Sequence, residues 1–198
     1  IFGALMLQLE QGDAMITGTT RTFAQTAREL RYVLDPKKDE VSFGIHVLVG
    51  KSHTIFMGDT TVNERPSAEE LAHIAEKTAA VARRMGHTPR VAFLSYSTFG
   101  YPRGERAEYV RNAVAVLDKR NVDFEYDGEM AVDVALNPEA RRLYPFCRLT
   151  GPANVLVMPA IHSAAISTRL AAALGGATVI GPLLVGLKLF VQISQPDV

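Results

Sequence analysis

A run of hydroxyl-bearing residues and glycine follows an apolar segment near the middle of the chain. The segment RVAFL (90–94) is typical of a buried strand, and Ser95, Ser97, Thr98 and Gly100 come directly after it. Ligands of open α/β sheets collect where strands end and helices begin. Hydroxyl groups, a closely approachable backbone and the N–H groups at a helix start would all suit a phosphate or another anion.

Two arginines near the start of the following helical segment strengthen this interpretation. Arg103 and Arg106 add positive charge that could pair with phosphate oxygens. The alternative is an ordinary polar connection, because Ser, Thr and Gly are the usual residues of turns. Neither a P-loop pattern nor G-x-G-x-x-G is present in the sequence. The residue types alone leave both interpretations open.

Three carboxylates lie close together further along the chain. Asp127, Glu129 and Asp133 belong to the segment YDGEMAVDVAL. Such a group could bind a metal ion or carry out acid–base chemistry. It could equally cap the helix predicted to follow, and capping is the interpretation that we favour.

The histidines and the cysteine give weaker signals. The five histidines show no spacing typical of metal ligands. His162 follows a strand-like segment, which is a plausible site position, although a lone histidine there is usually a polar surface group. Cys147 is the single cysteine and has no activating base nearby in the sequence, so we expect a buried structural thiol in a reducing compartment.

The composition is that of an ordinary globular protein and excludes several functional classes. Of the 198 residues, 47% are hydrophobic and 21% are charged, with 21 Lys plus Arg balancing 21 Asp plus Glu. No net charge draws the chain to nucleic acid or to an anionic membrane, so neither is an expected partner. The most apolar stretch, 177–193, is broken by glycine, proline and lysine and is too short to span a bilayer.

The elements that must position these residues alternate between helical and strand-like patterns. The clearest helix begins at the capping box of Ser67 and Glu70 and ends at Gly86. Helical spacing also predicts helices over 2–12, 22–34, 105–121 and 163–174. Strand-like segments are 14–18, 44–50, 53–59, 90–96, 122–130 and 153–159, with the second and third joined by a hairpin turn.

This alternation predicts an α/β protein with a layered α/β/α architecture and a mostly parallel sheet. The segments VAFL (91–94) and NVLVMP (154–159) are apolar without interruption. Strands that are buried on both faces have this pattern, so we expect helices to cover both faces of the sheet.

Several motifs resemble the phosphate acetyltransferases, the phosphotransacetylase family, in order and spacing along nearly the whole chain. The motifs are LSYSTFG (94–100), VDFEYDGEMAVDVAL (122–136), GPANVLVMPAI (151–161) and LGGATVIGPLLVGL (174–187), preceded by GDAMITGTTRTFAQTARELRYVL (12–34). The resemblance implies the fold of that family, which is like that of isocitrate and isopropylmalate dehydrogenases.

Two longer segments, 83–120 and 144–164, resemble more closely the C-terminal phosphotransacetylase-like domain of large bacterial hybrid malic enzymes. In those proteins a malate-oxidising domain, which uses NADP and a divalent metal, precedes this one. The resemblance implies a regulatory domain that holds no cofactor of its own and binds acetyl-CoA as an effector. It also implies a cytoplasmic homo-oligomer, with a dimer formed through this domain.

The sequence departs from the active members of the family at several positions. Gln195 and Pro196 stand where active members carry a Ser-Arg pair, and Ala160 and Ala165 stand where an acidic residue and an asparagine are usual. The missing arginine would neutralise charge in the transition state. The resemblance therefore implies a domain without catalytic residues. The alternative is a working phosphate acetyltransferase that moves acetyl between CoA and phosphate by positioning and charge stabilisation.

The resemblance implies a domain that still binds acetyl-CoA or phosphate but no longer catalyses acyl transfer. Arg28 matches the arginine on the phosphate side of the family's site, and residues 95–98 match its hydroxyl loop. We expect the two regions to face each other across a cleft. The expected contacts with acetyl-CoA or phosphate are Thr17, Gly18, Arg28, Ser95, Ser97, Thr98 and Gly100.

The resemblance also predicts how the chain is divided. We expect a truncated domain of the family in which residues 10–185, approximately, form the second subdomain and the flanking pieces belong to the first. The apolar segments 165–174 and 178–187 are candidates for a subunit interface, with ordinary core as the competing interpretation.

Overall fold

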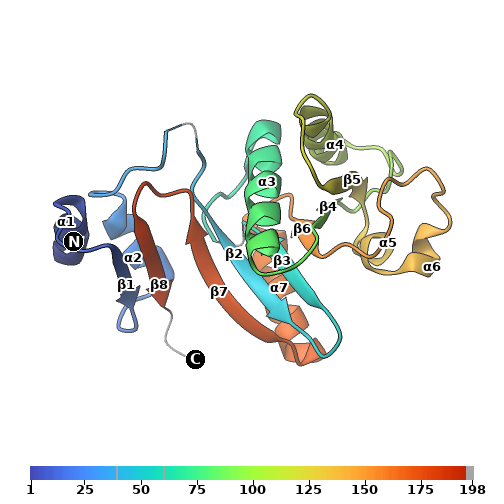
Figure 1. The fold of residues 1–198 in the computed structure, drawn as a ribbon. Helices are drawn as coiled ribbons and strands as arrows, with labels where there is room; N and C mark the ends of the chain where they lie inside the picture. The colour runs from blue at the N-terminus through green and yellow to red at the C-terminus, as the bar shows by residue number, and fades with distance from the viewer. Residues whose placement is uncertain (39, 60, 195–198) are drawn as a thin grey trace.

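A six-stranded sheet with the order β5-β4-β6-β3-β2-β7 forms the centre of the molecule in the computed structural model, which describes residues 1–38, 40–59 and 61–194 (Figure 1). Its strands are β2 (Phe43–Val49), β3 (Thr54–Gly58), β4 (Arg90–Leu94), β5 (Glu125–Met130), β6 (Val155–Val157) and β7 (Thr178–Val185). Strands β5, β4, β6 and β3 are parallel, whereas β2 pairs antiparallel with both β3 and β7. The expectation of a mostly parallel sheet is confirmed.

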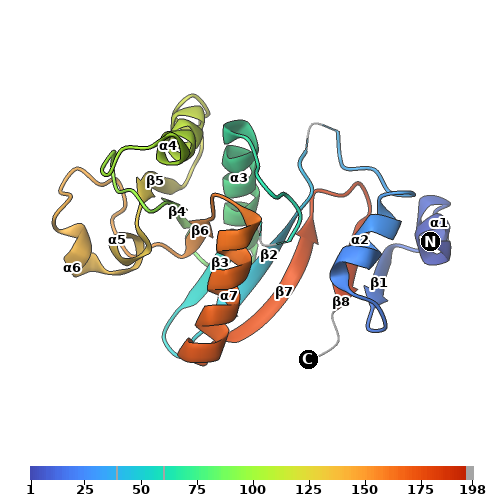
Figure 2. The same ribbon diagram turned by 180° about the vertical axis from the view of Figure 1, so that it is seen from behind.

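Helices cover both faces of this sheet, as the two opposite views show (Figures 1 and 2). On one face lie α3 (Ala68–Arg84) and α4 (Glu105–Asp118), and on the other lie α5 (Val132–Leu136), α6 (Pro138–Arg141) and α7 (Ile161–Gly175). The predicted α/β/α layering is therefore confirmed. In the described ranges no helix combines the length and the apolarity needed to cross a bilayer.

Local sequence signals account for the start and stop of the longest helix. The backbone N–H of Glu70 donates to the Ser67 hydroxyl over 3.2 Å, and the backbone N–H of Ser67 donates to the Glu70 carboxylate over 2.6 Å. This is the predicted capping box, which satisfies two N–H groups that the helix itself leaves unpaired. Arg83 and Arg84 occupy the last turn, where positive charge complements the helix dipole.

The hydrophobic core is divided between the two faces of the sheet. Phe43, Phe56 and Phe93 are fully buried against α3 and α4. Met130 and Leu156 belong to a second cluster under α5 and α7. Apolar strands with buried side chains on both faces produce these two clusters, as the uninterrupted apolar segments predicted.

The two ends of the chain form a small separate sheet. Strand β1 (Ala14–Gly18) pairs parallel with β8 (Phe190–Ser194), and both lie at the far end of the molecule beyond β7 (Figure 1). Helices α1 (Phe2–Gln8) and α2 (Phe23–Leu30) pack against this pair through a third apolar cluster. The division into two subdomains at residues 10 and 185 stays a prediction.

The sequence patterns missed a few boundaries. Helical spacing predicted a helix over 22–34, but α2 ends at Leu30, and Leu34 reaches the core from the segment that follows the turn at 31–33. The short helices α5 and α6 have too few residues for a helical period to be visible.

Candidate functional site

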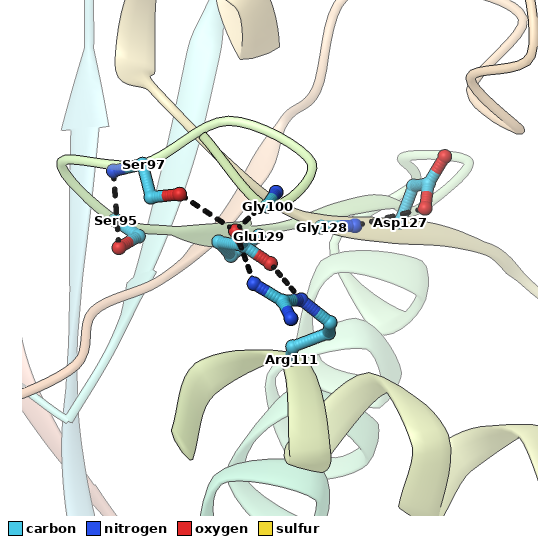
Figure 3. A network of polar contacts seen from close by, with 7 residues as sticks. All are labelled: Ser95, Ser97, Gly100, Arg111, Asp127, Gly128 and Glu129. Carbon is cyan, nitrogen blue, oxygen red and sulfur yellow. Dashed lines mark hydrogen bonds and ion pairs between the residues drawn. The ribbon is translucent and has the colours of Figure 1, made fainter. Parts of the chain in front are cut away.

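The loop after β4 is folded around a buried carboxylate. Glu129, in β5, is fully buried, and its side chain accepts hydrogen bonds from the Ser97 hydroxyl and the Gly100 N–H, both over 2.8 Å (Figure 3). The guanidinium of Arg111, on α4, reaches the same carboxylate with Nε at 2.9 Å and Nη2 at 3.2 Å. Three segments that are distant in sequence therefore meet at one side chain.

Charge and hydrogen bonding keep this carboxylate ionised. Burial alone would raise the pKa of Glu129, but the hydrogen bonds from Arg111, Gly100 and Ser97 outweigh burial and leave that pKa below its ordinary value. The same pairing raises the pKa of Arg111. Glu129 and Arg111 therefore form a fixed ion pair, in which the Arg111 side chain is about half exposed and the Glu129 carboxylate is shielded from water.

Glycine allows the strand to bring this carboxylate into place. Gly128 has φ of 151°, and a Cβ there would lie 2.8 Å from the Phe93 carbonyl oxygen. Only glycine lets β5 approach β4 this closely.

Most polar groups of the predicted hydroxyl loop are used inside the protein. Ser97 and Gly100 hold Glu129, and the Thr98 hydroxyl accepts the backbone N–H of Ala131 over 3.0 Å. Ser95 accepts the backbone N–H of Ser97 over 3.3 Å and also lines a cavity. The loop is therefore an internally bonded turn around a carboxylate, which corrects the picture of a row of hydroxyls directed at an anion.

The remaining predicted contacts lie at the other end of the molecule. Thr17 and Gly18 end β1 in the small sheet, and Arg28 is exposed in the last turn of α2. Strands β6, β3, β2 and β7 separate them from the loop after β4 (Figure 2). The expectation that Arg28 faces Ser95 across a cleft is wrong within this chain, because the small sheet lies beyond the opposite edge of the six-stranded sheet.

The three carboxylates that cluster in sequence point to different partners. Asp127 accepts the backbone N–H of Arg148 over 2.7 Å and its Nε over 3.3 Å, while Glu129 holds the loop and Asp133 is exposed in the first turn of α5. The expectation that they cap the next helix is wrong, because the N-cap of α5 is Ala131, which has no capping side chain, and none of the three carboxylates accepts an N–H group of the first turn. Among the described residues, no three His, Cys, Asp or Glu side chains are grouped to hold a metal ion.

Arg148 joins Asp127 to a further carboxylate, Asp118, on the outer edge of the sheet. Its Nη1 lies 2.6 Å from Asp118, which also accepts the Tyr126 hydroxyl over 2.9 Å, and the guanidinium stacks 4.8 Å from the centre of the Tyr126 ring. Burial opposes ionisation of Asp118, but the hydrogen bonds from Arg148 and Tyr126 leave its pKa lowered. This cluster fastens the chain that follows α6 to β5, which is a structural role.

A cavity of about 630 Å³ lies between α5 and α7 on one face of the sheet. We call it the α5–α7 cavity. Its floor is formed by apolar side chains of the strands, among them Ile55, Met57, Leu94 and Leu156. Periodicity could not reveal this cavity, because its lining side chains carry the same pattern as filled core.

The weaker candidates occupy unremarkable positions. His162 is exposed in the first turn of α7. Cys147 is half-buried, and burial raises the pKa of its thiol, so the unreactive thiol form is favoured as expected. Arg103 and Arg106 are exposed around the start of α4.

Two of the expected departures from the family pattern, Ala160 and Ala165, lie at the start of α7. Ala160 is the N-cap of α7 and makes no side-chain cap bond, and Ala165 lies in the second turn. Gln195 and Pro196 lie outside the described residues. The interface candidates are the body of α7 and the edge strand β7. On α7, Ile166, Leu170 and Leu174 are exposed.

The fold and the site together define a class of protein. Its members are layered α/β/α domains in which a buried ion pair orders a hydroxyl-bearing loop. Comparisons with known proteins agree with that class. A model of the phosphate acetyl/butaryl transferase family matches residues 1–196, so the chain belongs to that family.

The similar proteins include malic enzymes and a phosphotransacetylase. The chain is 54% identical over 98% of its length to an NADP-dependent malic enzyme of Rhizobium meliloti, and 43% identical over 98% to a probable NADP-dependent malic enzyme of Rickettsia prowazekii. It spans only about a quarter of each, 26%. A phosphotransacetylase structure from Streptococcus pyogenes matches 99% of the chain with a TM-score of 0.92 and 30% identity, over 61% of that protein. The resemblance noted from the motifs is confirmed.

Proposed function

We propose that the chain is the CoA-ester-binding regulatory domain of an NADP-dependent malic enzyme and has no acyltransferase activity. The observation that carries the proposal is the 54% identity, over 98% of this chain, to a malic enzyme of which the chain spans 26%. In this proposal NADP and a divalent metal bind in another domain of the longer, cytoplasmic protein, and acetyl-CoA is the effector bound here.

Features of the site support the loss of chemistry. Ala160 and Ala165 stand where active relatives are expected to carry polar side chains, so the start of α7 presents methyl groups. The hydroxyls of Ser97 and Thr98 are committed to internal hydrogen bonds. A reaction slows about tenfold for every 1.4 kcal/mol of transition-state stabilisation that is lost. The loss of a few charge-stabilising groups therefore abolishes useful rates.

In this proposal, regulation arises from a difference in the affinity of acetyl-CoA for two arrangements of the assembly. An effector shifts activity at a distant site only if it binds one arrangement of the assembly more tightly than the other. Arg28 is the proposed phosphate contact on the small sheet, with Thr17 and Gly18 beside the end of β8. Ser95 is a second proposed contact, at the other end of the six-stranded sheet.

The experiment is malate oxidation by the full-length protein as a function of acetyl-CoA concentration, with and without Arg28→Ala. We expect acetyl-CoA to change the rate, and Arg28→Ala to shift the half-effective concentration about tenfold or more, as loss of a charge-assisted contact predicts. Arg31→Ala is the matched control, because Arg31 is also exposed at the end of α2. Equal responses in the two variants would show that the phosphate contact lies elsewhere.

A second candidate is a working phosphate acetyltransferase. The 30% identity and TM-score of 0.92 to a phosphotransacetylase favour it. Production of acetyl phosphate from acetyl-CoA and phosphate, at rates typical of enzymes, would establish this function and overturn the first. A domain that only holds subunits together would instead give no heat and no change in thermal stability with acetyl-CoA.

A further inference from the structure

A second pocket opens at the amino ends of the parallel strands, beside the turn between β2 and β3. We call it the turn pocket, and its volume is about 520 Å³. Thr54 begins β3, Arg90 begins β4 and Asn154 precedes β6, and all three line it. Ser95, by contrast, follows the carboxyl end of β4. The turn pocket is therefore separate from the proposed acetyl-CoA contacts.

The turn pocket is strongly basic. Four basic side chains line it: Lys51, His53, His87 and Arg90. No carboxylate lines it among the described residues. The nearby Glu125 accepts both the N–H and the hydroxyl of Thr150, over 2.9 and 2.7 Å, so its carboxylate is already used. The pocket is thus suited to an anion.

Internal contacts hold the two histidines of the turn pocket. The Ser52 hydroxyl lies 3.0 Å from Nδ1 of His53. The ring of His87 packs edge-on against Phe56, with the ring centres 5.3 Å apart. Side chains that are positioned before a ligand arrives lose less entropy when it binds.

The arginine of the pocket is also fixed. Its Nε donates to the Pro152 carbonyl over 2.8 Å, and its Nη groups make no hydrogen bond among the described residues. Asn154 joins the two walls, because its Oδ1 accepts the N–H of Arg90 and its Nδ2 donates to the Thr88 carbonyl, both over 2.8 Å. The Nη edge of the guanidinium can therefore take a carboxylate in two parallel hydrogen bonds.

The position of α3 favours carboxylates over phosphates in the turn pocket. Phosphates are commonly bound at the amino end of a helix. Here the helix end is the carboxyl end of α3, which stops at Arg84, shortly before His87. The partial negative charge at that end opposes a compact, doubly charged group more than single charges spaced along a carbon chain.

We propose that the turn pocket binds a small organic polycarboxylate, with two or three carboxylates on a short carbon chain. Arg90 and Lys51 pair with two of the carboxylates, and Ile55 and Ala153 contact the carbon chain. Lys51 also borders the α5–α7 cavity, but Arg90 and Ala153 do not, so the ligand stays outside that cavity. This inference does not depend on the proposed acetyl-CoA response.

Calorimetry of the full-length protein in the absence of divalent metal tests the ligand class. The probes are tricarballylate, glutarate and butyrate, which carry three, two and one carboxylates. Each added carboxylate pairs with a further basic side chain, so we expect each to tighten binding about fivefold or more. Affinity that does not depend on the number of carboxylates would overturn the proposal.

Charge-removing variants test the location. We expect Arg90→Gln and Lys51→Gln each to weaken tricarballylate binding about fivefold or more. Arg142→Gln and Lys119→Gln are the matched controls, because both residues are exposed outside the pocket, and binding should not change. Melting temperatures check folding, and Lys51→Gln alone decides if Arg90→Gln does not fold, since Lys51 is exposed in a turn. Unchanged binding in Lys51→Gln would overturn the proposal.

Competing anions test the choice of carboxylates. Tripolyphosphate should bind more weakly than tricarballylate, and tighter binding that Lys51→Gln weakens would assign the pocket to phosphates and overturn the proposal. Acetyl-CoA should not compete with tricarballylate. Competitive displacement would place the tricarboxylate in the proposed acetyl-CoA site, which would overturn this inference and leave the proposed function standing.

Discussion

At the scale of single residues, burial gives similar side chains different roles. Asp127, Glu129 and Asp133 are one acidic cluster in the sequence, yet Glu129 is fully buried and Asp133 is exposed. Glu129 receives four hydrogen bonds from Ser97, Gly100 and Arg111. Its removal would leave donors unpaired, so the loop after β4 depends on this one carboxylate.

Glu129→Gln should therefore destabilise the protein, by about 3 kcal/mol at neutral pH, which denaturant unfolding measures. Because the pKa of Glu129 is lowered, its contribution is complete above about pH 4.3, the unfolded value, and is lost as the pH falls through the lower folded pKa. The difference from wild type should shrink accordingly in acid. Glu139→Gln, an exposed partner of Arg142, should change stability by less than about 0.5 kcal/mol. Equal effects of the two variants would refute the assigned role.

His46 is a second residue whose environment sets its charge. It lies on β2, half-buried, and burial followed by the nearby positive charge of Arg169 lowers its pKa to about 4. The imidazole is therefore neutral in the folded protein at the pH of most assays.

This shift predicts a pH-dependent stability with a definite sign. Unfolded chains bind a proton at His46 below about pH 6.5, whereas the folded protein does not until about pH 4, so stability falls as the pH drops between these values. We expect a loss on the order of 1–2 kcal/mol between pH 7.5 and pH 5. Replacing the residue in His46→Gln should flatten this dependence, and His162→Gln, at an exposed position, should not. Parallel pH curves for all three proteins would contradict the assignment.

At the scale of elements, the two chain ends depend on each other. Strands β1 and β8 come from opposite ends of the described chain and pair only with each other. Gly18 ends β1 with φ of 117°, and a Cβ there would lie 1.9 Å from the Ser194 carbonyl oxygen. The pairing therefore requires glycine, because a side chain would meet backbone that has no room to move.

Gly18→Ala should loosen the small sheet and leave the six-stranded sheet intact. The local strain should cost about 1–3 kcal/mol. Hydrogen exchange would show faster exchange in residues 14–18 and 190–194, with protection of β3, β4 and β6 retained. Gly12→Ala is the matched control, because a Cβ at Gly12 meets nothing within 4 Å. Uniform loss of protection over both sheets would show instead that they unfold as one unit.

At the scale of the whole molecule, apolar surface remains exposed along one helix. Ile166, Leu170 and Leu174 recur every four residues on α7 and are 63%, 55% and 81% exposed. None of the three residues lines the α5–α7 cavity, and α7 as a whole contacts the edge strand β7. We propose that this face contributes to the homo-oligomer, since contiguous exposed apolar surface marks interaction sites.

Leu170→Glu should weaken self-association at least tenfold in sedimentation experiments, because a carboxylate buried in a subunit contact loses its hydration. Leu143→Glu provides the control, since Leu143 is 78% exposed outside α7. Identical subunit numbers for the two variants would place the interface on another face.

The sequence by itself determined the layers and most of the elements, although it did not predict α5, α6, β7 or β8. Helical and strand periods, the capping box at Ser67 and the uninterrupted apolar segments 91–94 and 154–159 are local, and each predicted an element that the structure contains. The family motifs are also local patterns in the sequence, and together they identified the fold.

Only the tertiary structure decided which distant residues meet. Arg111 carries no local signal, yet it becomes the partner of Glu129 because α4 crosses beside β5. The family resemblance predicted that Arg28 and Ser95 face each other, yet the order of the strands places Ser95 near one edge of the six-stranded sheet and Arg28 beyond the other edge (Figure 2). The α5–α7 cavity could not be predicted from the sequence. The spacing of apolar residues shows which side of an element is apolar, but it does not show whether another side chain fills the space beside that element.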